Sequence, residues 1–169
     1  MQSKKWSVAA TYGFVLALIT ISYQLIMAVL APGTAISLLL WAAKFGGTLY
    51  LLYYFIKEFA KQTEFFSYSD GFKFGLIVSF LSSIVCAVYM FLHFAVIFPD
   101  SVAAQLEQAM TMMQSNPEAI DQIASIEDKL PQIVFVVILF YNTIFGAIAS
   151  AIIANYTKKG DIFDSKETF

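Results

Sequence analysis

The sequence predicts an all-α membrane protein, a bundle of four transmembrane helices, and two observations lead to this fold class. Of the 169 residues, 59% are hydrophobic and only 13% are charged, whereas a soluble domain carries about 25% charged residues. Charged residues are absent from three long stretches, residues 6–43, 74–99 and 130–157. Because a membrane-spanning helix needs roughly 20 mostly apolar residues, we expect a single integral membrane domain over residues 1–169.

The first apolar stretch is long enough for two spans, and Pro32 and Gly33 divide it into a hairpin. Lys4 and Lys5 give the chain a basic start, as in a signal peptide. The apolar region that follows is far longer than the roughly 7–15 residues of a signal peptide, so we expect an uncleaved transmembrane helix. The expected spans are residues 7–30, 34–56, 71–98 and 131–156.

The lysines near the membrane ends predict the orientation. Eight of them lie before the first span, in the 57–70 loop and its margins, or in the tail 157–169. The opposite side has Lys129 alone. We therefore expect both termini in the cytoplasm, in a bacterial inner membrane, with the 31–33 turn and the 99–130 loop outside.

The cytoplasmic loop mixes aromatic rings with lysines, which is typical of contact with lipid headgroups. Membrane anchoring explains this composition, and membrane lipids are the expected partners. The residues of this expected interface are Lys57, Lys61, Phe65, Phe66, Tyr68, Asp70 and Lys73.

The 99–130 loop repeats apolar residues at helical spacing, which predicts a pair of short amphipathic helices. Asn116, Pro117 and Glu118 are typical of a helix start. The loop carries six acidic residues and one lysine. Its apolar stripes either fold against each other and the rim of the bundle or wait for a protein partner, and both interpretations stay open.

Small residues recur every four positions in the spans, and in lipid such stripes let helix backbones approach closely. They predict a compact left-handed bundle, but the same stripes could serve contacts between copies, so a homo-oligomer stays open. Residues 13–19 and 71–77 share a Gly-Phe-x-x-small-Leu-Ile pattern, and whether the two hairpins are a duplication also stays open. The expected packing glycines are Gly13, Gly46, Gly47, Gly71, Gly75 and Gly146.

Lys44 interrupts an apolar run, LWAAKFGGTLY, and no span contains an acid to neutralise it. At about 1.5 Å per residue its backbone lies roughly 15 Å deep, where a lysine costs about 2.5–3.5 kcal/mol on insertion scales. Helical side chains lean toward the helix N-terminus, so we expect the ammonium to reach toward the outer face.

Other polar groups are expected at the same level and could form one outward-opening pocket with Lys44 as its floor. An anionic ligand such as a lipid headgroup or phosphate would suit it. In the alternative interpretation Lys44 snorkels alone, or is held by carbonyls and waters, and only fixes helix packing. The residues of the expected pocket are Lys44, Gln24, His93, Asn142, Tyr23 and Tyr89.

The sequence offers no signal for catalysis. It has no arginine, no Walker loop, no HExxH and no GxSxG. His93 is the one histidine, so no His–His metal pair exists, and Cys86 is expected to be a small apolar packing residue. We expect no enzyme activity, no cofactor, no metal and no nucleic-acid partner.

Residues 66–75 read FSYSDGFKFG and lead into a span, followed by His93, Phe98-Pro99-Asp100 and an acidic helical loop. This arrangement resembles the domain of unknown function 4199 family, small four-span inner-membrane proteins of Gram-negative bacteria, over nearly the whole chain. The resemblance brings no established activity and no catalytic residues. It implies a partner, because genes of this family often lie beside glycosyltransferases that load sugars onto polyprenyl phosphate.

These observations lead us to expect a non-enzymatic accessory or scaffold subunit for a membrane enzyme, a polyprenyl-phosphate glycosyltransferase by resemblance. The partner would dock on the 57–70 loop and the small-residue stripes. The alternative is a small flippase or transporter for a lipid-linked sugar or an anionic solute, using the pocket around Lys44. The sequence sets neither the substrate, the partner's identity nor the oligomeric state.

Overall fold

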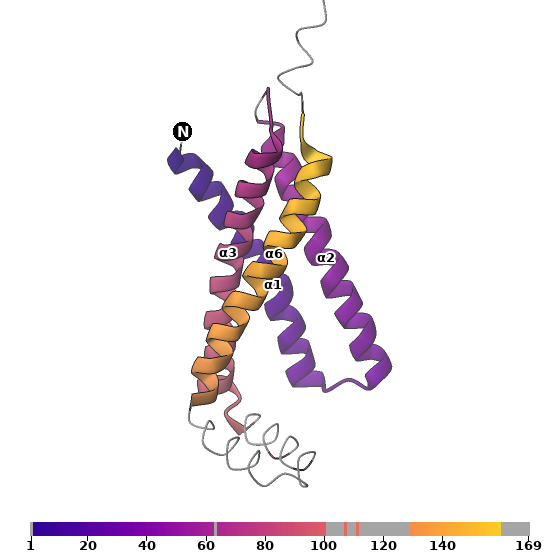
Figure 1. Cartoon of the computed structure of the whole chain (residues 1–169). Coiled ribbons are helices and arrows are strands. Elements are labelled where there is room, and N and C mark those ends of the chain that lie inside the picture. The colour runs from indigo at the N-terminus through magenta and orange to yellow at the C-terminus, as the bar shows by residue number, and fades with distance from the viewer. Residues whose placement is uncertain (1, 63, 101–106, 108–110, 112–128, 160–169) are drawn as a thin grey trace, which may run out of the picture.

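The computed structural model describes residues 2–62, 64–100, 107, 111 and 129–159. They form four long helices, all long and apolar enough to cross a membrane, which confirms the expected four-helix fold of a multi-pass membrane protein (Figure 1). The expected helical pair in the 99–130 loop lies almost wholly outside the described residues. The elements are α1 (Gln2–Leu30), α2 (Thr34–Ala60), α3 (Tyr68–Leu92), the π-helical turn η1 (His93–Ile97) and α6 (Leu130–Thr157).

Local sequence signals set the starts of α3 and α6. The Ser67 side chain accepts a hydrogen bond from the Asp70 N–H at 3.2 Å, and the Asp70 carboxylate accepts one from the Ser67 N–H at 3.2 Å. This capping box satisfies two backbone donors that the helix leaves unpaired, so α3 begins three residues before the expected residue 71. Pro131 stands in the first turn of α6, where its missing N–H costs nothing.

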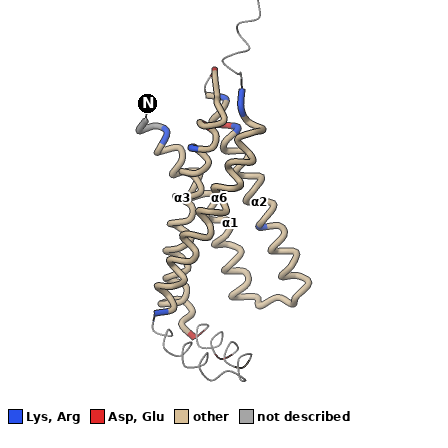
Figure 2. Tube along the Cα trace, viewed as in Figure 1, with Lys and Arg blue, Asp and Glu red and all other residues tan. Residues whose placement is uncertain are grey.

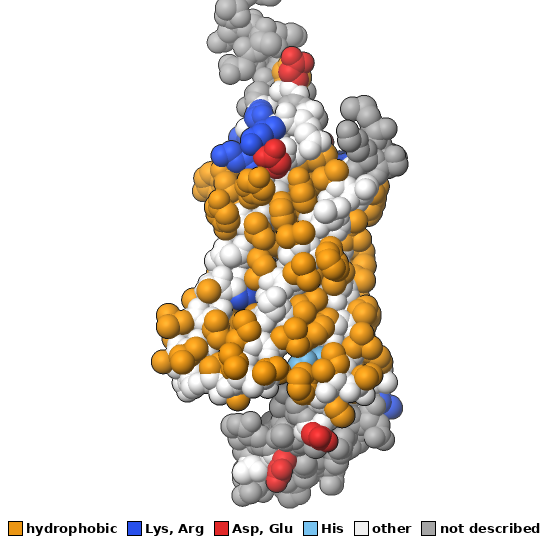
Figure 3. All heavy atoms as spheres, turned by 180° about the vertical axis from the view of Figure 1, so that it is seen from behind, with side chains coloured by type: hydrophobic (Ala, Val, Ile, Leu, Met, Phe, Trp, Pro, Cys, Tyr) orange, Lys and Arg blue, Asp and Glu red, His pale blue; other side chains and the backbone are white. Residues whose placement is uncertain are grey.

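Apart from Lys44 in α2, the charged residues that the structure describes gather at the two ends of the bundle (Figure 2). We call the end that carries the start of α1, the 61–67 segment and Lys158–Lys159 the basic end. The far end carries the 31–33 turn and Asp100. Between them a broad band of apolar side chains covers the surface (Figure 3). This distribution suits a bilayer, whose hydrocarbon core faces apolar groups and leaves charges at either side.

The hydrophobic core lies toward the basic end. Ile56, Phe74 and Val78 are fully buried there, and the ring of Phe59 stacks on that of Phe74 with 3.9 Å between centroids. Toward the far end the buried cluster is smaller and joins only α3 and η1 to α6, around Phe94. Figure 1 shows α1 and α2 running away from α3 and α6 over this half. The bundle is therefore tight at the basic end and splayed at the far end.

Small residues bring α3 and α6 together. A Cβ added at Gly75 would stand 2.5 Å from the Ser150 hydroxyl, and one at Gly146 would overlap the Ser79 side chain. A Cβ at Gly71 would stand 3.2 Å from that of Ala154. These facing positions form a zipper of small residues, and such close approach is how helices associate in lipid.

The other expected packing glycines differ among themselves. An added Cβ at Gly13 would stand 2.9 Å from the Val78 carbonyl oxygen, so α1 crosses α3 closely at this point. An added Cβ at Gly47 would make an ordinary contact with Ile19 at 3.9 Å. The expectation for Gly46 is not met within the described chain, because an added Cβ there would meet nothing within 4 Å. The neighbouring Phe45 packs on Phe145 of α6 with 5.5 Å between ring centroids, so α2 still contacts α6 at this level, and Gly46 lies on the exposed side of α2.

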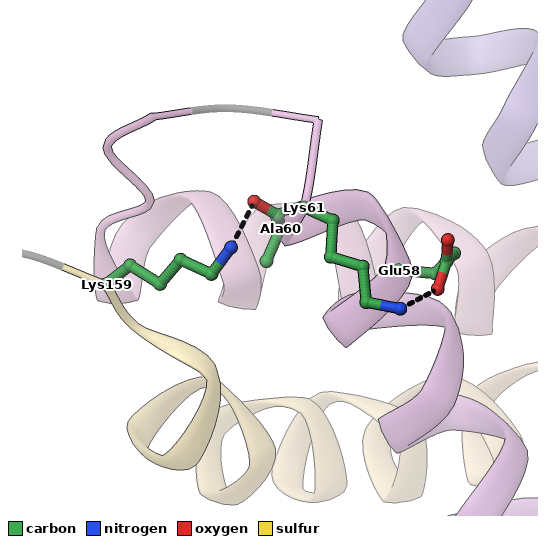
Figure 4. Close-up of polar contacts among 4 residues, drawn as sticks. All are labelled: Glu58, Ala60, Lys61 and Lys159. Carbon is green, nitrogen blue, oxygen red and sulfur yellow. Dashed lines mark hydrogen bonds and ion pairs between the residues drawn. The ribbon is translucent and has the colours of Figure 1, made fainter.

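The 61–67 segment is tied to the end of α6. Phe66 and Lys159 exchange two backbone hydrogen bonds, of 3.2 and 2.8 Å, and the Lys159 ammonium donates to the Ala60 carbonyl at 3.3 Å (Figure 4). Phe66 is consequently only 1% exposed, while Phe65 is 63% exposed. The placement of Phe66 at the lipid interface is thus corrected: its ring is a core residue, because the backbone pairing turns it inward.

Candidate functional site

A cavity of about 40 Å³ lies in the middle of the bundle, beside the crossing of α1 over α3. Polar side chains from all four spans line it, among them Thr20 of α1, Thr48 of α2, Ser79 and Ser82 of α3, and Asn142 of α6. Serine, threonine and asparagine side chains in transmembrane helices form hydrogen bonds between helices, and here they converge from all four spans on one cavity. This convergence makes the central cavity our candidate site.

The hydrogen bonds around the cavity make its wall rich in acceptors. The Thr48 hydroxyl donates to the Lys44 carbonyl at 2.8 Å, and the Ser83 hydroxyl donates to the Ser79 carbonyl at 2.7 Å. A hydroxyl has one hydrogen and two lone pairs. Each of these two hydroxyls therefore donates its one hydrogen to a backbone carbonyl of its own helix. Their oxygens remain as acceptors toward a guest in the cavity.

Ser79 adds an unsatisfied group. Its side chain is 4% exposed, and its hydroxyl has no hydrogen-bond partner among the described residues. The same holds for the Ser150 hydroxyl, one layer nearer the basic end and 0% exposed. A buried hydroxyl without a partner costs about 1–3 kcal/mol. A water in the cavity would remove that cost at Ser79.

The cavity volume sets the size of the guest. One water needs about 10–15 Å³ of volume measured in this way, so the 40 Å³ present has room for about three or four waters at most. Sites for small organic ligands are typically about 300–1,000 Å³. In this conformation the cavity therefore suits water or another small hydrogen-bond donor, and it is too small for a sugar.

Lys44 lies one helical turn from Thr48, on the far-end side of the cavity. Its side chain is half-buried, and its ammonium stands 5.4 Å from the centroid of the Tyr23 ring on α1. Such a cation–π contact is worth about 0.5–2 kcal/mol, less than the cost of a lysine at this depth. Gln24, beside Tyr23 in the chain, is also half-buried.

Tyr89 and His93 form a second polar pair, within α3 and η1. The Tyr89 hydroxyl and His93 Nδ1 are 3.2 Å apart, and the His93 ring packs on those of Phe94 and Phe98 at 5.1 and 4.9 Å. His93 is 6% exposed, and its carbonyl accepts the wide-turn hydrogen bond from the Phe98 N–H at 2.8 Å. Its immediate surroundings are aromatic.

The six residues of the expected pocket therefore fall into separate groups. The structure brings Lys44 to Tyr23 between α1 and α2, pairs Tyr89 with His93 on α3 and η1, and places Asn142 in the cavity wall. Sequence reasoning missed the cavity's other polar residues. The signal that could have found them is a hydroxyl near the middle of each of the first three spans, opposite Asn142 in the fourth.

The described residues contain no cluster of three His, Cys, Asp or Glu side chains that could hold a metal ion. The sole cysteine, Cys86, is buried in the cavity wall beside Thr20 and Ser82.

Comparison with known proteins gives one match. No curated protein and no solved structure matches the chain. The family profile described as "Protein of unknown function (DUF4199)" matches residues 11–159, a range that contains nearly all of the four spans and the whole cavity. The chain therefore belongs to the DUF4199 family of proteins of unknown function.

Proposed function

We propose that this protein is a non-enzymatic accessory subunit of the bacterial inner membrane, with both termini in the cytoplasm, that docks on a membrane enzyme. By family resemblance the enzyme is a polyprenyl-phosphate glycosyltransferase. The observation that carries the proposal is the open face of α2 around Gly46.

The other glycines of α1, α3 and α6 are used inside the chain, against Val78, Ala154, Ser150 and Ser79. Gly46 alone of the described helix-interior glycines has open space where a side chain would be. A glycine costs a helix about 1 kcal/mol relative to alanine, and within the chain Gly46 gives no packing in return.

The surroundings of Gly46 suit a second helix. Ala42 and Ala43 lie one turn away and are exposed, and Leu39 and Tyr50, at 70% and 66% exposure, extend the same side of α2. Of the most apolar stretch of α2 only 6% is buried, against 44% for α3. A shallow notch of small residues between large apolar ones is the surface on which transmembrane helices dock.

The test is purification in native lipid, followed by mass spectrometry of the proteins that remain bound. We expect a stoichiometric membrane enzyme with the native chain and its loss from Gly46→Leu, which fills the notch. Ala28→Leu is the matched control, because Ala28 is a small, exposed residue of α1, and it should keep the partner. A native chain that runs alone after gentle extraction would overturn the proposal.

The second candidate is a small flippase or transporter for a lipid-linked sugar or an anionic solute. Lys44 favours it, because this cation lies in a span with no acidic side chain within ion-pair distance among the described residues. The cavity volume of about 40 Å³ favours the accessory subunit instead. Lys44→Met separates the two: a transporter loses activity while it stays inserted, whereas an accessory subunit keeps its partner.

A further inference from the structure

Two lysines from different helices flank one groove near the basic end. The groove has a volume of about 340 Å³ and is lined by Lys5 and Trp6 of α1 and by Lys73, Leu76 and Ile77 of α3. Lys5 is half-buried, while Lys73 is exposed and Trp6 is 53% exposed. The groove shares no lining residue with the central cavity or with the open face of α2, although Ile77 is two residues from Ser79 of the cavity wall.

The groove is layered along the membrane normal. Leu76 and Ile77 follow Lys73 by three and four residues, so they lie about 5–6 Å deeper along α3. Tryptophan prefers the level of the lipid headgroups, and Trp6 follows Lys5 directly. The cationic groups and the indole thus form the upper part of the groove, and its lower part is aliphatic.

An aromatic ring lies near one of the two groove lysines, and one carboxylate interacts with both. The Lys5 ammonium stands 5.8 Å from the centroid of the Phe59 ring, which is fixed by its stack on Phe74. Asp70 interacts electrostatically with Lys5 and Lys73. Its carboxylate also caps α3, because Oδ2 accepts hydrogen bonds from the Ser67 hydroxyl at 2.7 Å and the Ser67 N–H at 3.2 Å. Its single negative charge leaves the two lysines with a net positive charge.

Among the described residues, no carboxylate lies within ion-pair distance of Lys5 or Lys73; the pair that does form at this end joins Lys61 to Glu58 at 2.7 Å (Figure 4). The groove therefore presents a cationic rim above an apolar floor. An anionic phospholipid has the complementary order, a phosphate above an acyl chain, and basic pockets between transmembrane helices bind such headgroups.

We propose that this groove is a binding site for one anionic phospholipid. Lys5 and Lys73 contact the phosphate, Trp6 lies beside the headgroup, and one acyl chain runs along Leu76 and Ile77. The site holds one lipid with a negatively charged headgroup at a fixed position, whereas the other lysines of the basic end attract anionic lipids without binding any one of them.

The two tryptophans of the chain, Trp6 and Trp41, allow a direct test. Trp41→Phe leaves Trp6 as the reporter inside the proposed site. The protein is reconstituted in vesicles of phosphatidylcholine that contain increasing fractions of brominated phosphatidylglycerol, or of brominated phosphatidylcholine, and quenching of Trp6 is recorded. We expect phosphatidylglycerol to quench at a much lower fraction, because it concentrates in the groove.

A lysine close to an anionic headgroup contributes about fivefold to the binding of that lipid. Lys5→Gln and Lys73→Gln should each lower the preference for phosphatidylglycerol about fivefold, and the double variant about 25-fold. The corresponding arginine variants should keep it. Lys158→Gln is the matched control, because Lys158 is an exposed lysine at the same end, and it should leave the preference unchanged.

Quenching by brominated phosphatidylcholine verifies that each variant is inserted. Equal quenching by the two lipids in the native background would overturn the proposal. So would an equal loss of preference in Lys158→Gln, since the effect would then belong to the general charge of the basic end.

Discussion

Gly146→Ala is the sharpest test of the contact between α3 and α6. The added Cβ would overlap both the Cβ and the hydroxyl of Ser79 and stand 3.6 Å from its Cα. Rotation of the Ser79 side chain moves the hydroxyl but not the Cβ, so the helices must separate. Overpacking of this kind costs about 1–3 kcal/mol, and the better helix propensity of alanine returns up to about 1 kcal/mol.

We therefore expect Gly146→Ala to lower the free energy of unfolding by about 1–2 kcal/mol. The measurement is reversible unfolding in mixed detergent micelles, followed by circular dichroism. Ser79→Gly in the same chain restores the space, so the double-mutant cycle should show a favourable coupling of about 0.5–3 kcal/mol.

Gly46→Ala is the control, because nothing lies within 4 Å of the added Cβ. It should be neutral or should stabilise the helix by up to about 1 kcal/mol. If Gly146→Ala proves as stable as Gly46→Ala, the two helices do not approach as closely as described, and the small-residue zipper is refuted.

Phe66→Ala should lower the free energy of unfolding by about 3–5 kcal/mol, because it empties a buried site. Phe65→Ala, at an exposed ring, should change it little. Equal effects of the two variants in unfolding titrations would contradict the inward placement of Phe66. Ser67→Ala removes the cap of α3 and should lower the free energy of unfolding by about 0.5–2 kcal/mol. Ser67→Asp, whose carboxylate can still accept hydrogen bonds from the helix N-terminus, should recover part of that loss. No loss in Ser67→Ala would show that the cap is dispensable. For the orientation, a fluorescent protein fused after residue 169 should fluoresce and an alkaline phosphatase at the same point should be inactive, and the reverse pattern would place the tail outside.

The positions of the spans could be predicted because charge is excluded from hydrocarbon. The stretches without charge gave the fourth span as 131–156, and the helix runs from Leu130 to Thr157. The third was expected over 71–98 and is found as α3 followed by the π-helical turn to Ile97. Hydropathy cannot distinguish an α-helical from a π-helical turn, and the capping box that starts α3 at Tyr68 is polar and lies outside any apolar window.

The candidate site was harder to predict, because it depends on how the helices cross. Lys44 stands out in the sequence as a lone cation, but Thr20, Thr48 and Ser79 are unremarkable in a transmembrane segment. Periodicity tells which residues share a face of one helix and leaves open how far that helix is rotated toward its neighbours. The close approach at Gly13 sets that rotation for α1, and Thr20 faces Thr48 and Ser79 across the cavity as its consequence.

The tight crossing at Gly13 is also a pivot point, about which α1 can rotate relative to α3. The part of α1 from Gly13 to Leu30 is about 25 Å long, and Thr20 lies about 10 Å from Gly13 along it, at 1.5 Å per residue. A rotation that separates the far ends of α1 and α3 by a given distance would therefore separate the cavity walls at Thr20 by about two-fifths of that distance. Separation of α1 from α3 at the far end would therefore enlarge the small cavity near Gly13, while the backbone pairing of Phe66 with Lys159 still holds the 61–67 segment to the end of α6.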